Sequence, residues 1–191
     1  MNAEKRHIFL MGERGVGKST AIRALTGRLL SRGVTCGGFE TTAGPETAPG
    51  RDAVYMLPYR ADAEARTLSE DRIVATRDRI GSRYESRPAV FDALGADFLR
   101  RAAHCDLIVM DELGFMEAEA HIFQDAVLSL LDGARSVLGV VKPPSASKGL
   151  AFPERVRTHP AVLLFPLTRE NRDAAPARLW SLLAPRLNAF D

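Results

Sequence analysis

The stretch GERGVGKS at residues 12–19 decides the fold, because it has the form of a P-loop, a glycine-rich turn that holds phosphate groups. The apolar run IFLM at residues 8–11 precedes it and predicts a buried strand, and apolar residues at helical spacing follow it over residues 21–30. A strand, a glycine-rich turn and a helix in this order place phosphates at the start of a helix, where free backbone N–H groups favour negative charge. The stretch therefore predicts binding of a nucleoside triphosphate.

The residue types of the loop indicate how each part of a triphosphate would be bound. Glycines allow a tight turn that brings backbone N–H groups close to phosphate oxygens. Lys18 is expected to place its charge on the β- and γ-phosphates and to act in catalysis, and the Ser19 hydroxyl is expected to bind Mg2+. The predicted phosphate-binding residues are Gly12, Gly15, Val16, Gly17, Lys18, Ser19 and Thr20.

A second motif, LIVMDE at residues 107–112, has the form of a Walker B strand. Its four apolar residues predict a buried strand, and Asp111 at the end of that strand is the expected carboxylate ligand of Mg2+. Glu112 lies one residue further toward the place of the γ-phosphate, so we expect it to act as the general base for the attacking water. The alternative is that Glu112 only forms an ion pair with a nearby arginine.

Short apolar runs alternate with helical patterns along the chain. This alternation predicts an α/β fold with a mostly parallel sheet, helices on both faces, and a single P-loop domain over residues 1–191. Further strands are expected over residues 34–39, 53–57, 137–141 and 162–165, with a turn-rich segment at 43–51, and helices over about 119–131 and 172–187, the last bent near Pro176 and Pro185. Ligands of such sheets bind outside the carboxyl ends of the strands.

The segment over residues 60–87 differs in composition from the rest of the chain. It holds seven arginines and six acidic residues but few large apolar residues. This composition predicts either a solvated surface excursion or a mobile flap.

Composition excludes several classes of protein. With 46% hydrophobic and 26% charged residues, the chain has the composition of a soluble globular protein. The 26 Lys and Arg residues nearly balance 24 Asp and Glu residues, and no basic run is interleaved with aromatic residues, so nucleic acid is not an expected partner. The apolar runs are too short to span a membrane and no signal-peptide pattern is present, so we expect no membrane partner and a cytoplasmic location.

Four stretches resemble, in order and rough spacing, the motifs of the cancer-related nucleoside-triphosphatase family. They are the P-loop, GGFET at residues 37–41, DELGFME at 111–117 and LTRENRD at 167–173. The resemblance implies a RecA-like P-loop fold and slow, Mg2+-dependent hydrolysis of several nucleoside triphosphates. It also implies that Asn171 and Arg172 lie near the base and ribose of the nucleotide. Residues 42–90 depart from the family's pattern, so substrate choice or a partner surface is expected to differ there.

Some residues outside these motifs have two interpretations. A basic residue of the Pro-rich loop after residue 141 would stabilise charge in the transition state, or these residues are only solvated. Thr41 contacts the γ-phosphate or is a turn hydroxyl, and Glu117 pairs with a basic residue near the phosphates or caps the following helix. The basic candidates are Lys142, Lys148, Arg155 and Arg157.

Three functions are compatible with these features. The first is a nucleoside-triphosphatase with broad base tolerance. A guanine-specific switch GTPase is disfavoured, because no NKxD-like sequence is present. The second is a kinase in which the Arg-rich segment holds an anionic acceptor, and the third is a regulatory module whose nucleotide state controls an unknown protein partner. A carboxylate beside the metal-binding Asp111 favours hydrolysis, because a kinase gains nothing from a group that activates water.

Overall fold

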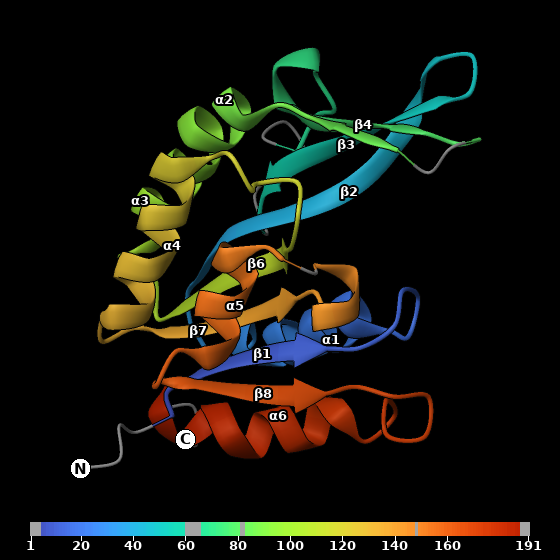
Figure 1. The fold of residues 1–191 in the computed structure, drawn as a ribbon. Coiled ribbons are helices and arrows are strands. Elements are labelled where there is room, and N and C mark those ends of the chain that lie inside the picture. The colour runs from blue at the N-terminus through green and yellow to red at the C-terminus, as the bar shows by residue number, and fades with distance from the viewer. Residues whose placement is uncertain (1–4, 60–65, 81–82, 148, 188–191) are drawn as a thin grey trace.

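The P-loop strand lies inside an eight-stranded sheet in the computed structural model, which describes residues 5–59, 66–80, 83–147 and 149–187 (Figure 1). The strands are β1 (His7–Met11), β2 (Cys36–Ala48), β3 (Arg51–Pro58), β4 (Ile73–Asp78), β5 (Tyr84–Ser86), β6 (Leu107–Leu113), β7 (Ser136–Val141) and β8 (Val162–Pro166). The α-helices are α1 (Lys18–Leu30), α2 (Pro88–Val90), α3 (Ala96–Ala102), α4 (His121–Asp132), α5 (Ala151–Thr158) and α6 (Ala175–Leu183). A π-helical stretch, Phe91–Gly95, joins α2 to α3, and short 3-10 helices span Glu70–Arg72, Pro144–Ala146 and Ala184–Arg186.

The sheet has a parallel core and an antiparallel extension. Its strand order is β5-β4-β3-β2-β6-β7-β1-β8. Strands β2, β6, β7, β1 and β8 pair in parallel, and β3, β4 and β5 continue the sheet from β2 in antiparallel pairs. Strand β7 therefore lies between β1, which leads into the P-loop, and β6, which carries Asp111, although it follows both in the sequence.

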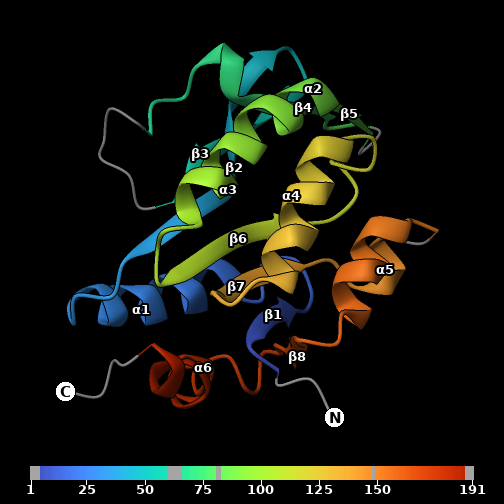
Figure 2. The same ribbon diagram turned by 90° about the vertical axis from the view of Figure 1, so that its left-hand side faces the viewer.

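Helices cover both faces of the parallel core, as predicted. Alternate residues of the buried strands point to opposite faces. Leu107 and Val109 of β6 pack with α1 and α6, whereas Ile108 and Met110 pack with α3, α4 and α5. Figure 2 shows these two sets of helices on opposite sides of the sheet. Within the described residues, no helix combines the length and apolarity needed to cross a membrane.

The hairpin of β2 and β3 differs from the prediction. The predicted turn over residues 43–51 is confirmed only at residues 49–50 and is wrong for residues 43–48, because β2 continues to Ala48 and pairs with β3 almost to its end. Register shifts on either side of Glu46 show that Gly44 and Pro45 are accommodated as irregularities of a strand rather than as a chain reversal. Pairing with β3 thus overrides the local preference of a Gly-Pro pair for a turn.

Two other segments also need correction. Within residues 60–87, β4 and β5 belong to the sheet and Ile73, Val74 and Ala75 are buried, so these residues are not a solvated excursion. Residues 60–65 and 81–82 of that segment lie outside the described part of the chain. The last helix does not run from 172 to 187 with bends: Pro176 lies in the first turn of α6, where proline needs no N–H partner, and Pro185 opens a separate 3-10 helix.

Candidate active site

The P-loop forms the turn between β1 and α1. Gly15 (φ 77°) and Gly17 (φ 109°) adopt left-handed backbone conformations, which other residues rarely tolerate. A Cβ atom at Gly12 would overlap the carbonyl oxygen of Leu167, in the loop after β8. Helix α1 begins at Lys18 without a side-chain cap, so N–H groups at its start remain available for an anion.

Lys18 is already directed along this loop. Its Nζ donates hydrogen bonds to the carbonyl oxygens of Gly12 (2.9 Å) and Glu13 (2.8 Å). Burial lowers the pKa of Lys18, and the neighbouring carboxylates of Glu112 and Asp111 oppose that shift. The ammonium group is therefore held over the loop by weak neutral acceptors that phosphate oxygens can replace.

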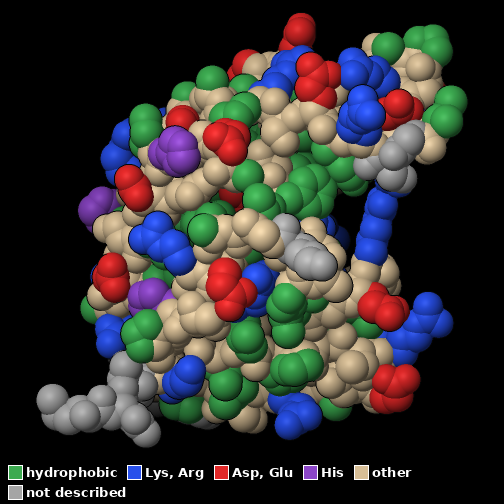
Figure 3. Space-filling model, in the orientation of Figure 1, with side chains coloured by type: hydrophobic (Ala, Val, Ile, Leu, Met, Phe, Trp, Pro, Cys, Tyr) green, Lys and Arg blue, Asp and Glu red, His purple; other side chains and the backbone are tan. Residues whose placement is uncertain are grey.

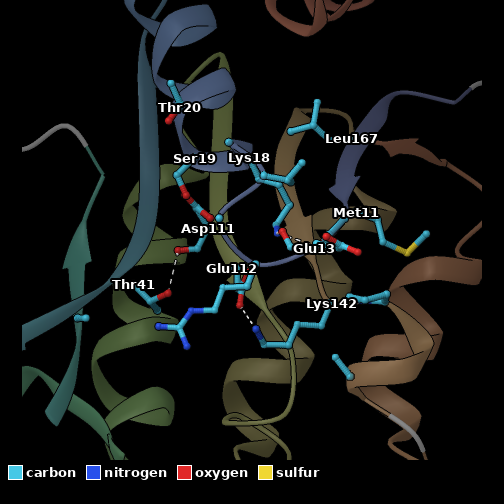
Figure 4. Close-up of a pocket in the computed structure, with 18 of the residues that line it drawn as sticks. Met11, Glu13, Lys18, Ser19, Thr20, Thr41, Asp111, Glu112, Lys142 and Leu167 are labelled. Atoms are coloured by element: carbon cyan, nitrogen blue, oxygen red, sulfur yellow. Dashed lines mark hydrogen bonds and ion pairs between the residues drawn. The ribbon is translucent and has the colours of Figure 1, made fainter. Parts of the chain in front are cut away.

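Ser19 and Asp111 lie next to each other at the edge of the sheet (Figure 4). Asp111 is 6% exposed, and burial raises its pKa to about 6, while a hydrogen bond from Ser19 opposes the shift and the carboxylates of Glu112 and Glu40 add to it. Thr41 Oγ1 donates to the backbone oxygen of Asp111 at 3.3 Å, so its hydroxyl is engaged with the strand end. A cation at Asp111 would relieve the repulsion among these carboxylates.

Glu112 pairs with a lysine rather than an arginine. Its Oε1 accepts a hydrogen bond from Nζ of Lys142, the residue that follows β7, and both side chains are 23% exposed (Figure 4). Between Met110 and Leu113, β6 has one residue more than β7 beside it. Such a bulge changes the direction of side chains, and it lets both Asp111 and Glu112 face the same cavity.

One cavity of about 1170 Å³ collects most of the predicted site. All seven predicted P-loop residues, together with Asp111, Glu112 and Lys142, line it. It lies between the parallel core and the antiparallel extension, where the surface is visibly hollowed (Figure 3). The cavity is large enough for a ligand the size of a nucleotide.

Asn171 and Arg172 do not line this cavity. Asn171 instead stabilises the loop after β8: its Oδ1 accepts from the N–H of Thr168 (2.9 Å) and its Nδ2 donates to the oxygen of Pro166 (3.0 Å). The Nε atom of Arg172 lies 3.7 Å from Oδ1 of Asp173. The cavity wall at this end is formed by residues 166–170, so this loop, rather than the two predicted side chains, faces the cavity.

The other basic candidates differ in their burial and in whether they line the cavity. Arg157 is buried and donates to the carbonyl oxygen of Lys142 (2.7 Å), to Ser147 Oγ (2.9 Å) and to Glu154, so it anchors the loop after β7. Arg155 is exposed and does not line the cavity. Lys148 lies outside the described residues. Of these candidates, Lys142 alone lines the cavity within the described part of the chain.

Glu117 has neither of its two predicted roles. It is completely buried, and its Oε1 accepts a hydrogen bond from the backbone N–H of Gly114, which closes the turn after β6. Its Oε2 has no hydrogen-bond partner among the described residues, and burial raises its pKa to about 7.

The antiparallel extension contributes cavity residues that no sequence motif predicts. Asp52, Arg77 and Tyr84 are register partners across β3, β4 and β5, so their side chains share one face, and all three line the cavity. Tyr84 packs edge-on against Phe115 at 5.0 Å between ring centres. The Nε atom of Arg77 is buried and has no hydrogen-bond partner among the described residues. Only the register of three strands brings these residues together, and no local pattern in the sequence encodes it.

The residues present fit a magnesium ion shared with a nucleotide. Within the described chain, no cluster of three or more His, Cys, Asp or Glu side chains is placed to hold a metal by itself. Ser19 and Asp111 offer two oxygen atoms, and Mg2+ is commonly bound by one or two protein oxygens together with substrate phosphates and waters.

Comparison with known proteins agrees with this geometry. Residues 7–180 match the model of a family described as NTPase. The chain belongs to this NTPase family. The cancer-related nucleoside-triphosphatase homolog of Bos taurus is 34% identical over 176 residues, which cover 88% of this chain and 91% of the relative. The nucleoside-triphosphatase THEP1 of Methanosarcina barkeri is 29% identical over 173 residues, which cover 90% and 94%.

A solved structure confirms the fold expected for this NTPase-family chain. The solution structure of a human cancer-related nucleoside triphosphatase superposes with a TM-score of 0.71 at 27% identity, covering 94% of this chain and 98% of that one. The predicted family, the α/β fold and the assignment to the nucleoside-triphosphatases are therefore confirmed.

Proposed function

We propose that this NTPase-family protein hydrolyses nucleoside triphosphates to diphosphate and phosphate in the cavity at the P-loop, with Mg2+ and with broad tolerance for the base. One observation carries the proposal: Lys18, the Ser19–Asp111 pair and Glu112 come from different elements and line one cavity. These are the charge, the metal ligands and the base that hydrolysis of a triphosphate requires.

The P-loop residues bind the triphosphate. The N–H groups at the start of α1 and the Lys18 ammonium take the phosphate oxygens, and the Gly12 and Glu13 carbonyls release the ammonium when they do. Ser19 and Asp111 would hold Mg2+, which supplies positive charge to the phosphate oxygens when it is bound.

Glu112 activates the water. Its carboxylate takes a proton as the water oxygen forms a bond to the γ-phosphorus, and the bridging oxygen leaves with the nucleoside diphosphate. Glu112 suits this role because it faces the cavity one residue beyond Asp111.

Broad base tolerance is supported by the loop after β8. Residues 166–170 form the cavity wall there, while the Asn171 side chain is used within the loop. No asparagine or glutamine is among the described residues that line the cavity, so no side-chain amide is available there to select one base over another. Phosphate release from ATP, GTP, CTP, UTP and deoxynucleotides with Mg2+ tests this point, and activity with a single base would contradict it.

The test of the mechanism is Glu112→Gln. The variant should bind nucleotide at least as tightly as the wild type and lose at least roughly a hundredfold in kcat, because it removes the proton acceptor together with a negative charge beside Lys18 and Lys142. Glu119→Gln is the matched control, since Glu119 is exposed and lies outside the cavity. Wild-type turnover by Glu112→Gln would remove Glu112 from the role of base.

A second candidate, phosphoryl transfer to a small anionic acceptor, is favoured by Arg77. This arginine lines the cavity with an unpartnered buried Nε among the described residues, next to its register partner Asp52 and with Cζ 5.9 Å from the centre of the Tyr84 ring. Nucleotide consumption that depends on an added acceptor, with negligible release of phosphate in its absence, would establish this function in place of hydrolysis.

A further inference from the structure

Lys142 lines the cavity and contacts the proposed base, but the proposed hydrolysis gives it no role. It follows β7, the strand between β1 and β6, so its side chain emerges between the phosphate-binding loop and Glu112. We propose that Lys142 is a catalytic residue that exchanges partners during the reaction. In the nucleotide-free protein its ammonium holds Glu112, and with a triphosphate bound it contacts the γ-phosphate and leaves Glu112 free to activate water. This inference rests on the proposed hydrolysis at the same site.

The main chain at Lys142 is fixed from both sides. Its N–H donates to the oxygen of Leu113 at 2.9 Å, which continues the pairing of β7 with β6. Its carbonyl oxygen accepts from Arg157 at 2.7 Å, and the same guanidinium donates to Ser147 Oγ at 2.9 Å. The base of the side chain is therefore anchored, and any change of partner must come from rotation of the side chain itself.

The side chain has room to rotate. Its stem lies against Gly114, where a Cβ atom would come within 2.8 Å of Cδ of Lys142. Its Nζ lies 5.6 Å from the centre of the Phe115 ring, and the side chain remains 23% exposed to the cavity. Gly114 and Phe115 thus support the stem, and the charged end extends into the cavity beside Glu112.

The charges of the cavity favour the exchange. In the nucleotide-free protein, the Glu112 carboxylate pairs with Lys142, and Lys142 also contributes to lowering the pKa of Lys18, so the two ammonium groups are electrostatic neighbours. A γ-phosphate bound at Lys18 would bring more negative charge to this place than one carboxylate does. Lysine binds phosphate as a point charge. The Lys142 ammonium is therefore attracted more strongly by the γ-phosphate than by the single negative charge of Glu112.

None of the other basic candidates within the described residues is paired with the proposed base. Arg157 is committed to the loop after β7 and to Glu154, and Arg155 is exposed outside the cavity. Arg77 enters from the antiparallel extension, on the far side of Glu112 from β7. Lys142 is the described cation that contacts the proposed base directly.

The test compares Lys142→Met with the wild type. Methionine keeps an unbranched stem against Gly114 and Phe115 but removes the charge. Calorimetry with Mg2+ measures binding of ADP and of the non-hydrolysable β,γ-imido analogue of ATP. We expect the variant to lose roughly tenfold or more in affinity for the analogue, as for a lost bond to a charged group, and to keep its affinity for ADP, which lacks the γ-phosphate.

Kinetics and a double variant complete the test. Lys142→Met should lower kcat by about a hundredfold, which is the loss expected when one donor to the developing negative charge is removed. Lys142→Arg keeps a positive charge and should therefore have a kcat between those of Lys142→Met and the wild type. On a Glu112→Gln background, Lys142→Met should still weaken binding of the analogue. Arg155→Met is the matched control and should resemble the wild type in every measurement.

Two outcomes would overturn the proposal. If Lys142 only positions Glu112, Lys142→Met leaves the ratio of analogue to ADP affinity unchanged and changes nothing on the Glu112→Gln background. If the wild type binds neither nucleotide, the proposed function itself is wrong, and the exchange falls with it.

Discussion

Glu117 is a fully buried carboxyl group whose surroundings favour its protonated form. The backbone N–H of Gly114 satisfies one of its oxygens, and the other has no partner among the described residues. Burial raises its pKa from 4.5 to about 7. Between these two values the folded protein binds more protons than the unfolded chain, so the free energy of unfolding falls as the pH rises through this range.

Glu117→Gln should remove this dependence, because glutamine keeps an oxygen for the Gly114 N–H and carries no charge. One pKa unit corresponds to about 1.4 kcal/mol, so from pH 5 to pH 8 the wild type should lose about 2 kcal/mol more unfolding free energy than the variant. Urea unfolding of the nucleotide-free proteins at both pH values measures the difference. Glu119→Gln, at an exposed position, should follow the wild type. Parallel pH dependence of Glu117→Gln and wild type would show that Glu117 is not titrating in this range.

The residues that the sequence revealed are those whose partners lie close by in the chain. The P-loop and the Asp111–Glu112 pair each combine their functional groups within a few residues next to an apolar run, so pattern alone brought them to notice. The contact of Lys142 with Glu112 depends instead on β7 entering the sheet between β1 and β6. The position of Arg77 in the cavity depends on the register of β4 with its neighbours.

Among the strands, those of the parallel core are encoded by local sequence patterns, whereas those of the antiparallel extension depend on pairing within the sheet. The parallel strands are apolar runs, and their alternation with helices predicted them. The second half of β2, TAGPETA at residues 42–48, has no such pattern and becomes a strand only because β3 pairs with it. Strand β4 lies within an arginine-rich segment, whose composition concealed a short buried stretch at Ile73–Ala75.

The backbone of β2 approaches β6 closely at Gly38. This glycine has a φ of 120° and pairs with Val109 of β6. A Cβ atom here would overlap the carbonyl oxygen of Val109 and lie 2.9 Å from its nitrogen. Backbone conformation and close approach both require glycine, at the point where β2 is directed toward Thr41 and the cavity.

Gly38→Ala should therefore lower the free energy of unfolding by at least about 2 kcal/mol, since strain at a positive φ and overpacking each cost about 1–3 kcal/mol. Gly33→Ala is the matched control: Gly33 also has a positive φ of 80°, but no atom lies within 4 Å of its Cβ position. It should cost only the strain of its backbone. Chemical denaturation of both variants compares them, and equal losses would mean that the approach of β2 to β6 adjusts to a side chain.

The cavity is lined by residues from both parts of the sheet, the parallel core and the antiparallel extension. Lys18, Asp111 and Glu112 reach it from the parallel core, and Arg77 and Tyr84 reach it from the antiparallel extension. A ligand that fills the cavity contacts both parts, so its binding free energy adds to the stability of the complete fold.

This coupling allows the proposed metal site to be measured through stability. At about a hundred times its dissociation constant, the β,γ-imido analogue of ATP should add about 2.7 kcal/mol to the free energy of unfolding. Removing Mg2+ with EDTA should abolish most of that gain, because the phosphates and Asp111 then repel each other across the Ser19 position. Asp111→Asn should gain less from the analogue and respond little to EDTA, whereas Asp125→Asn, exposed on α4 outside the cavity, should behave as the wild type. If EDTA leaves the stabilisation of the wild type unchanged, the nucleotide is bound without a metal at Ser19 and Asp111.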